Sequence, residues 1–154
     1  MPGTRVISPL LANVYLNGLD HRMSELGYQM VRYADDFVIL CKSMGQAESC
    51  LSELRQWTDA MLLTLHPEKT VIVDMSIRGS SFDFLGYRFT HTQRGHHQRH
   101  VSDKSKRKLR NKLRPYLKRT NGVSMETTVT LLNPILRGWF EYFRESHPQS
   151  LSEM

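Results

Sequence analysis

Two short runs of β-type residues meet at a pair of acidic residues, and this feature constrains the fold more than any other. Residues 28–33 and 37–41 are rich in branched and aromatic side chains, which favour strands. Asp35 and Asp36 lie between the two runs and favour a turn over a continuing strand. The pattern therefore predicts a β-hairpin with two carboxylates at its tip.

The two adjacent carboxylates indicate a metal site. Hard oxygen ligands suit Mg²⁺, which keeps several waters and binds through one or two carboxylates plus the phosphates of a substrate. A nucleoside triphosphate would supply those phosphates. In a two-metal site one ion activates the attacking hydroxyl and the other stabilises the leaving group, so Asp35 and Asp36 are too few to hold both ions. The alternative interpretation is an acidic turn that only closes an exposed hairpin.

Two amphipathic helices are predicted on either side of the hairpin. Apolar residues recur at helical spacing over residues 9–26, and Ser8 is placed to cap this helix. A second apolar stripe covers residues 47–62 and follows a capping-box pattern formed by Ser43 and Gln46. Both helices are expected to pack on one face of the same sheet.

Further strands and a change of composition complete the predicted α+β fold. Residues 70–75 and 82–89 are rich in branched or aromatic side chains and predict strands, so helices covering one side of an antiparallel sheet are the simplest architecture. Residues 91–102 are polar and basic and predict a loop or linker. An all-helical part is expected from residue 103 to residue 147.

Three helices are predicted in this last part. Asp103 is expected to cap a basic helix that ends near Arg114, because Pro115 disfavours continuation. Ser124 is expected to cap a short helix ending at residue 132, and Asn133 to cap another.

The positive charge of the chain is concentrated in one segment. The formal net charge is +6, and residues 104–119 hold nine Lys and Arg with no acidic residue, whereas the rest of the chain is net negative. A concentrated basic run indicates a polyanionic partner, for which RNA or DNA phosphate is the first expectation. The alternative is a solvated helical face. The side chains predicted to contact phosphate are Lys104, Lys106, Arg107, Lys108, Arg110, Lys112 and Arg114.

Four strings of residues, taken in order, resemble the reverse transcriptases encoded by group II introns. They are Val6–Asn13, Arg32–Phe37, Phe84–Tyr87 and Leu132–Trp139, the last followed by Tyr142-Phe143-Arg144. The first three resemble the polymerase, and the last resembles the maturase segment that follows it. The resemblance covers most of the chain.

The resemblance implies a partial polymerase palm over residues 1–90, a basic linker over residues 91–102 and a small all-α, thumb-like maturase segment over residues 103–147. The family's fingers region and first palm strand, which carries a third metal-binding Asp, precede the string that matches Val6–Asn13. The resemblance therefore implies a C-terminal portion of an RNA-directed DNA polymerase, a nucleotidyltransferase of mobile introns with maturase activity in RNA splicing.

The resemblance also assigns roles to single residues. Asp35 would be the principal Mg²⁺ ligand and Asp36 the supporting one, in a two-metal site that stays incomplete in this chain. Lys69 would lie near the departing pyrophosphate as a third catalytic residue, where a cation stabilises charge or donates a proton. A turn lysine paired with Glu68 or solvent is the alternative. Leu85-Gly86-Tyr87 resembles the primer-grip turn, with a plain strand bulge as the alternative.

Recognition of RNA shape or sequence is expected from the last helix. The planar groups of Arg137, Tyr142 and Arg144 can stack on unpaired bases or fork onto phosphate. Trp139 and Phe143 share an apolar stripe and are expected in the core.

Three functions follow from these observations. The first is a polymerase that copies intron RNA, with RNA template, DNA primer and dNTP bound once an upstream fingers and palm polypeptide completes the site. The second is a non-catalytic RNA-binding splicing factor in which the palm is only scaffold. The third is an inactive remnant. The missing third Asp favours the second for this chain alone, and group II intron RNA is the expected partner of the first two.

The remaining composition bears on compartment and other metals. Cys41 and Cys50 show no disulfide or metal-ligand spacing and are expected as small buried residues, which fits a reducing cytosol. No run approaches the roughly 18 apolar residues of a membrane span, so we expect no membrane partner and a cytoplasmic, RNA-associated protein of bacterial type. Four histidines fall within residues 91–100, but a zinc site is not predicted because no Cys or carboxylate lies nearby at ligand spacing.

Overall fold

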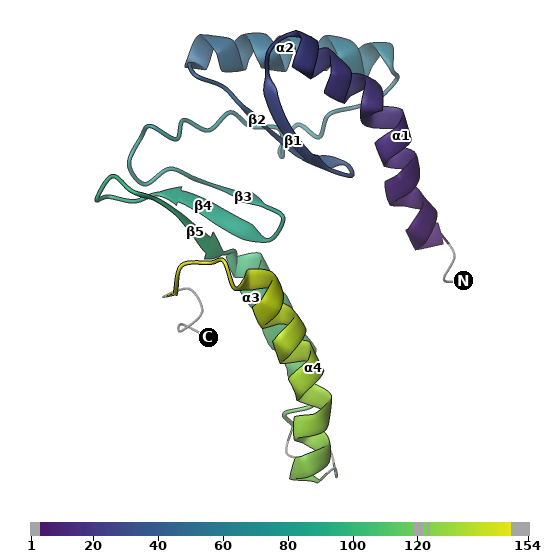
Figure 1. Ribbon diagram of the computed structural model, residues 1–154, viewed down its shortest axis with the longest axis vertical. Helices are drawn as coiled ribbons and strands as arrows, with labels where there is room; N and C mark the ends of the chain where they lie inside the picture. Colours follow the sequence, from purple (N-terminus) through teal and green to yellow (C-terminus); the bar gives the residue numbers. More distant parts are fainter. Residues whose placement is uncertain (1–3, 119–121, 123, 149–154) are drawn as a thin grey trace. The chain divides into compact units, whose positions relative to one another are not determined.

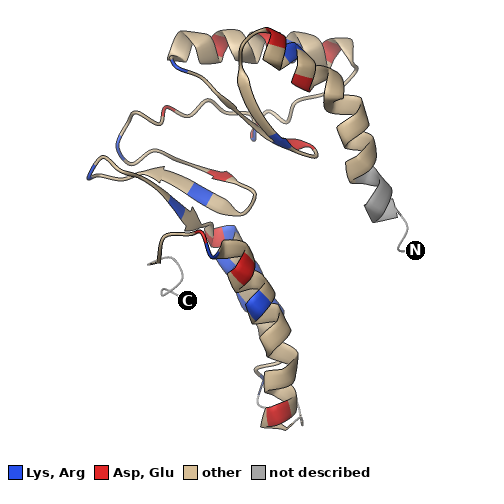
Figure 2. Cartoon of the chain, in the orientation of Figure 1, with Lys and Arg blue, Asp and Glu red and all other residues tan. Residues whose placement is uncertain are grey.

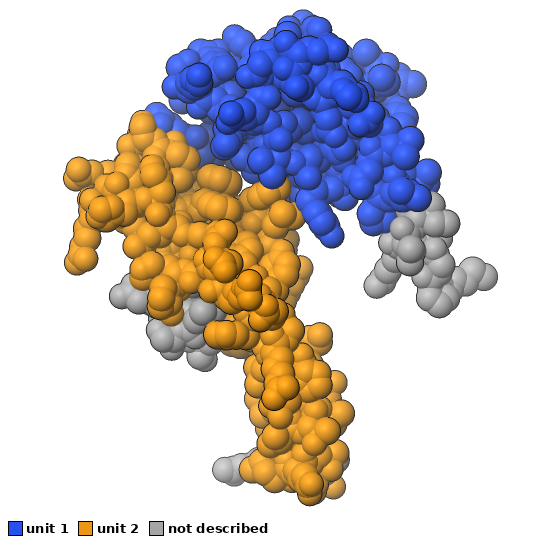
Figure 3. All heavy atoms as spheres, viewed as in Figure 1, with its two compact units in different colours: residues 1–74 blue, residues 75–154 orange. Residues whose placement is uncertain are grey.

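The computed structural model describes residues 4–118, 122 and 124–148, and the chain divides into two compact units, residues 1–74 and 75–154 (Figure 3). The first unit contains α1 (Thr4–Glu25), β1 (Gln29–Tyr33), β2 (Asp36–Leu40) and α2 (Met44–Ala60). The second contains β3 (Ser81–Phe84), β4 (Tyr87–His91), β5 (His97–Val101), α3 (Asp103–Leu113) and α4 (Met125–Phe143) (Figure 1). The α+β class is confirmed.

The predicted hairpin is present in the first unit. β1 and β2 pair antiparallel from Gln29 opposite Leu40 to Tyr33 opposite Asp36. The core of this unit joins the two helices and is formed by Leu19, Met23, Cys50 and Leu54. Partly buried hairpin residues, which include Met30, Phe37 and Ile39, pack against that cluster. One face of the hairpin is therefore covered by helices, as the amphipathic patterns indicated.

Both helices of this unit have defined ends, although α1 begins earlier than expected. The helix is already formed at Thr4 and continues through Pro9, so Ser8 does not cap it. Proline has a helical φ, and a helix that contains it loses one backbone hydrogen bond. At its other end Gly27 has φ +78°, its N–H donates to Ser24 (3.0 Å), and Tyr28 N–H donates to Met23 (2.9 Å). These two bonds form a Schellman motif.

The capping pattern predicted for α2 is confirmed. The Ser43 hydroxyl accepts the N–H of Gln46 at 3.2 Å, and the Gln46 side chain accepts the N–H of Lys42 at 2.6 Å. The returning bond thus reaches one residue before the cap, which is a small variation on the capping box.

The strand expected at residues 70–75 is absent. Residues 71–74 are irregular, and Val71 is 66% exposed. A strand needs a neighbour for its backbone hydrogen bonds, and no described strand pairs with these residues. In place of the one expected sheet, the described residues form two separate sheets, a two-stranded one and a three-stranded one in the order β3-β4-β5.

The expected linker over residues 91–102 contains a strand, β5. β5 pairs antiparallel with β4 from His91 opposite His97 to Tyr87 opposite Val101. Gly95, with φ +83°, lies in the turn between the two strands. The polar composition of β5 hid its pairing, because backbone hydrogen bonds to β4 do not depend on apolar side chains. The expected division at residues 90, 102 and 147 stays a prediction, whereas the compact units divide after Asp74.

The helical part differs from expectation at two caps. Ser102 caps α3 by accepting the N–H of Ser105 at 3.3 Å, and Asp103 is the first helical residue. Ser124 caps α4 as predicted, but Asn133 caps nothing and Pro134 lies inside a single helix. The expected break at residue 133 was wrong because α4 accommodates its proline as α1 does, at the loss of one hydrogen bond. No helix among the described residues is long and apolar enough to cross a membrane.

Candidate functional site

The two acidic residues lie at the tip of the β1–β2 hairpin, where the ribbon is coloured red for acidic residues (Figure 2). Ala34 and Asp35 form the two-residue turn, and Ala34 has φ +55°. A positive φ at the first central residue is typical of the tight turns that suit the twist of a hairpin. Asp35 is thus a turn residue, Asp36 begins β2, and both are exposed.

The hairpin presents its two faces to different surroundings. Side chains alternate along a strand, so Arg32 and its cross-strand partner Phe37 lie on the face that packs on the helices. Tyr33 and its partner Asp36 lie on the opposite face, where Tyr33 is 69% exposed and Val31 52%. Asp36 therefore extends from the open face, beside the turn that carries Asp35.

Arg32 connects the tip to α1. Its Nε donates to Asp20 Oδ1 at 2.8 Å, and Nη2 pairs with Asp20 Oδ2. Nη1 donates to Asn13 Oδ1 at 2.9 Å and to the Ala34 carbonyl at 2.8 Å. The hydrogen bond from Arg32 lowers the pKa of Asp20 and raises that of Arg32. Asp20 is therefore the ion-pair partner of Arg32.

Sequence reasoning missed this network, although one signal was available. Asn13 and Asp20 are seven residues apart, which places them on the same face of a helix two turns apart. A polar pair on the face turned toward the hairpin needs a partner there. Arg32 is the donor available there, because side chains alternate along β1 and that of Arg32 lies on the inward face while that of Tyr33 lies on the outward face.

The tip carboxylates fit a partial Mg²⁺ site. Within the part of the chain that the structure describes, neither Asp35 nor Asp36 forms an ion pair or a side-chain hydrogen bond. Two exposed hard oxygen ligands suit an ion that keeps waters and binds phosphate. In the same described residues there is no cluster of three or more His, Cys, Asp or Glu that could hold a metal. The residues present thus fit one side of a two-metal centre.

Lys69 lies in the turn that follows α2. Its backbone N–H donates to His66 at 3.1 Å and the residue is exposed. No ion pair with Glu68 is present among the described residues. The catalytic role of Lys69 stays a prediction.

Leu85 and Gly86 form the turn between β3 and β4. Their φ values are +49° and +84°, and Phe84 pairs with Tyr87 across a two-residue loop, so the segment is a tight hairpin turn and not a strand bulge. A Cβ on Gly86 would lie 2.9 Å from the Ser105 hydroxyl and 3.3 Å from the Phe143 ring. The Gly86 carbonyl accepts from Ser102 N–H at 2.9 Å and from the Ser105 hydroxyl at 3.1 Å.

Two tyrosines connect this turn to the end of α4. The Tyr142 hydroxyl donates to the Leu85 carbonyl at 2.8 Å, and the Tyr87 hydroxyl donates to the Tyr142 carbonyl. The Tyr87 ring lies 5.8 Å from the Tyr142 ring and 5.0 Å from that of Phe143, and burial raises the pKa of Tyr87. The hydroxyl of Tyr142, expected at an RNA contact, is therefore used within the protein, while the residue stays 54% exposed.

The basic helix α3 presents most of its charge to solvent. Six of the seven predicted contacts are exposed, namely Lys104, Arg107, Lys108, Arg110, Lys112 and Arg114. Lys106 is the exception, since it is 9% exposed on the inner side of the helix with Leu109. Its position three residues before Leu109 places both on one helix face. Arg119, the last residue of the basic run, lies outside the described residues.

The predicted contacts on α4 differ in how their charge is compensated. Arg144 pairs with Glu141 at 2.9 Å and with Glu145 at 3.5 Å. Arg137 is exposed and forms no ion pair with any residue in the described ranges. Phe143 is buried as predicted, and Trp139 is half-buried with its indole N–H lacking a partner in the described part of the chain.

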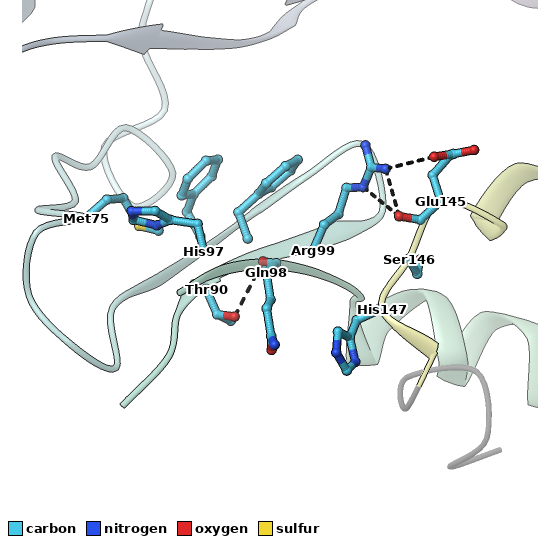
Figure 4. Close-up of a pocket in the computed structure, with 10 residues that line it drawn as sticks. Met75, Thr90, His97, Gln98, Arg99, Glu145, Ser146 and His147 are labelled. Carbon is cyan, nitrogen blue, oxygen red and sulfur yellow. Dashed lines mark hydrogen bonds and ion pairs between the residues drawn. The ribbon is translucent and has the colours of Figure 1, made fainter. Parts of the chain in front are cut away.

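A hollow of about 590 Å³ lies beside β5 and the residues that follow α4 (Figure 4). Arg99 lines it and donates to the Glu145 carbonyl at 3.1 and 2.7 Å, while its guanidinium also lies 5.2 Å from the Tyr87 ring. Arg99 thus already has partners within the protein. In the other unit Cys50 is buried, which raises the pKa of its thiol to about 11, and Cys41 is half-buried.

Comparison with known proteins gives two matches in chain order. Residues 3–89 match the family model for reverse transcriptase (RNA-dependent DNA polymerase). Residues 106–154 match the model for the group II intron, maturase-specific domain. The first match covers more than half of the chain and ends within β4, and the second includes most of α3 and all of α4. A search of curated proteins found no match.

Proposed function

Because the chain belongs to the group II intron reverse transcriptase and maturase family, we propose that it binds intron RNA through α3 and supplies two carboxylates to a polymerase active site. The observation that carries the RNA contact is the set of six exposed basic side chains, five on α3 and the sixth at its C-cap, Arg114. The observation that supports the active-site role is the pair of unpartnered carboxylates at the described hairpin tip. The two family matches favour this function over a purely RNA-binding splicing factor or an inactive remnant.

The metal assignment concerns Asp35 and Asp36. Reverse transcriptases generally use Mg²⁺, and these two residues would hold it with Asp35 as the principal ligand. The bound ion would neutralise charge that develops on phosphate oxygens during nucleotidyl transfer. Lys69 would stabilise the departing pyrophosphate as a surface cation. RNA template, DNA primer and dNTP are the proposed substrates.

A complete two-metal centre needs a further carboxylate, for which an upstream fingers and palm polypeptide is the proposed source. We therefore expect little or no polymerisation by this chain alone. The test is Mg²⁺-dependent primer extension on an RNA template by the purified chain, with Asp35→Ala as the control for contaminating polymerase. Extension that disappears in Asp35→Ala would contradict the need for another polypeptide. Extension that persists in the control would come from a contaminant.

The RNA contact is tested by its dependence on salt. Neutralising phosphates with Lys and Arg releases counterions, so the affinity for RNA falls as salt rises. A triple variant, Lys104→Ala, Arg107→Ala and Lys108→Ala, is expected to reduce the slope of log affinity against log salt by about 2 and to weaken binding at least about tenfold at low salt. The measurement is filter binding to a group II intron RNA.

The matched control removes the same charge elsewhere. Lys42, Arg55 and Arg78 are exposed residues outside α3, and replacing all three by Ala lowers the net charge equally. Its slope is expected to stay near that of the unmodified chain. Equal losses in both variants would show that only total charge matters, and the assignment to α3 would be withdrawn.

Arg137→Ala is expected to change the preference among RNAs more than the salt slope.

The proposed location is the cytoplasm, in association with intron RNA. Two unpaired thiols, one of them buried, and the basic face of α3 support this location.

A further inference from the structure

Arg32 occupies an unusual position for a charged residue in this unit. Its side chain is only 10% exposed, and its guanidinium donates to three different groups. Two bonds go to the Asp20 carboxylate, one to the Asn13 amide oxygen and one to the Ala34 carbonyl. The fork geometry of Arg suits such a cluster, whereas Lys could not reproduce its directions.

The bond to Ala34 acts directly on the tip. The Ala34 carbonyl belongs to the same planar peptide unit as the Asp35 nitrogen. The 2.8 Å hydrogen bond to that carbonyl therefore fixes the orientation of the peptide plane between Ala34 and Asp35. Ala34 has φ +55°, a region that residues other than Gly, Asn and Asp seldom occupy, so an external contact would help to hold the turn in this conformation.

Asp20 in turn determines where the guanidinium lies. Arg32 is a full positive charge only three residues from Asp35 and four from Asp36. With Asp20 bound to two of its nitrogens, the cation is held on the helix-facing side of the hairpin. Asp36 lies on the opposite face by strand alternation. Without Asp20 the cation would be free to pair with the tip carboxylates and would compete with a metal ion.

We propose that Asp20, Asn13 and Arg32 form a clamp that positions the Ala34–Asp35 turn and keeps both tip carboxylates available for a metal ion. The three are positioning residues, since they act through the turn. The clamp rests on the proposed function in one respect only, which is the role of the tip carboxylates as metal ligands.

The test uses the full chain with two readouts at the tip. Without metal, ¹⁵N relaxation reports the order of the Ala34, Asp35 and Asp36 amides. With Mn²⁺ as a paramagnetic substitute for Mg²⁺, broadening of the same signals gives the affinity of the tip. The variants are Asp20→Asn, which releases the guanidinium, and Arg32→Lys, which keeps the charge but loses the fork.

The matched control is Glu53→Gln. It removes the Arg22–Glu53 ion pair (3.0 Å), which also joins α1 to another element of the same unit but does not reach the turn. A gentler variant, Asn13→Ala, removes one bond to Arg32 and leaves the ion pair with Asp20 intact. It keeps the test usable if either stronger variant fails to fold.

Asp20→Asn and Arg32→Lys are expected to lower the order of the tip amides. Both are also expected to weaken Mn²⁺ binding by about tenfold, which is the lower end of the loss in metal affinity when a residue that orients metal ligands is replaced. Asn13→Ala is expected to act in the same direction but less, and Glu53→Gln to change neither readout. Tip amides that stay as ordered in Asp20→Asn and Arg32→Lys as in Glu53→Gln would overturn the clamp.

The two proposals fail in different ways. If Mn²⁺ broadens no tip signal in the unmodified chain, or broadens it equally in Asp35→Asn, the metal assignment fails. The order of the tip amides without metal still decides whether the clamp positions the turn. A structural contact without a positioning role would lower the unfolding temperature of Asp20→Asn while leaving the tip order unchanged.

Discussion

Two of the hairpin turns in the described residues share one backbone feature and differ in their surroundings. Ala34-Asp35 and Leu85-Gly86 are both two-residue turns whose first central residue has a positive φ. In the first turn Asp35 is exposed, and Arg32 binds the Ala34 carbonyl from one side. The second is packed under α3 and α4 through its carbonyls and its glycine. The side chains of an open turn can reach a ligand. The position of a packed turn instead depends on the elements that contact it.

This difference bears on the family assignment. The Leu85-Gly86-Tyr87 turn falls within the reverse transcriptase match, and its partners Phe143 and Tyr142 fall within the maturase match. The two matches therefore meet in one compact unit. A primer-grip role for the turn stays a prediction. In the structure, the helices α3 and α4 contact the turn itself.

The largest expected effect comes from Gly86→Ala. The added Cβ would approach Ser105 and Phe143 at 2.9 and 3.3 Å, and the backbone has φ +84°. We expect a loss of about 3 kcal/mol in unfolding free energy, from about 1 of backbone strain and about 2 of overpacking. Chemical denaturation measures it. Gly95→Ala is the control, because Gly95 has φ +83° and nothing lies within 4 Å of an added Cβ. Its expected loss in unfolding free energy is about 1 kcal/mol, from backbone strain alone. Equal losses would show that the packed turn is not crowded.

The next effect concerns the hydroxyl that binds the packed turn. Tyr142→Phe removes the 2.8 Å bond to the Leu85 carbonyl and keeps the ring contacts. The expected loss is about 1 kcal/mol, typical of one hydrogen bond. Urea denaturation compares it with Tyr33→Phe, which precedes the open turn and whose hydroxyl has no bond to any described residue. A loss no larger than that of Tyr33→Phe would remove the tyrosine from the support of the turn.

The open turn should respond in the opposite direction to glycine. Ala34→Gly relieves the strain of φ +55° but makes the unfolded chain more flexible. We expect a net gain of about 0.5 kcal/mol by the same denaturation assay. A loss of stability would mean that Ala34 contributes contacts that an exposed turn is not expected to have.

The smallest expected effect is a pH dependence that originates at the Asp20–Arg32 ion pair beside the open turn. Arg32 holds the pKa of Asp20 below its usual 3.8, so this pair contributes stability above about pH 4 and loses it as pH falls through the lowered pKa. Asp20 is 37% exposed, so solvent screening reduces the contribution. Asp20→Asn should therefore show a weaker decline in stability from about pH 4 to about pH 2 in urea titrations. An unchanged decline would assign acid sensitivity to other carboxylates.

Local patterns in the sequence were sufficient for part of the fold. The Asp35-Asp36 hairpin, the caps at Ser43 and Ser124 and the burial of Phe143 were all predicted. Each depends on residues within a few positions, where side-chain type and spacing decide the backbone conformation. The family resemblance rested on the same kind of short strings.

The failed predictions concern strand pairing, a proline inside a helix and one buried lysine. Residues 70–75 have strand propensity but no described partner strand, while the polar β5 pairs through its backbone. Pro134 suggested a break that α4 does not have, and Lys106 was counted with the exposed face although it is buried. Propensity and hydropathy describe single residues, and they do not describe which backbone groups pair or which face of a helix is buried.

The sequence by itself determined the family, the α+β class, the acidic hairpin tip and the basic helix, because motif order, alternation and charge are written in neighbouring residues. Only the tertiary structure decided that Arg32 binds Asp20, Asn13 and the Ala34 carbonyl, and that Gly86 lies against Ser105 and Phe143. Asp20 and Asn13 lie 12 and 19 residues from Arg32, and such contacts form only when packing brings their elements within hydrogen-bond distance.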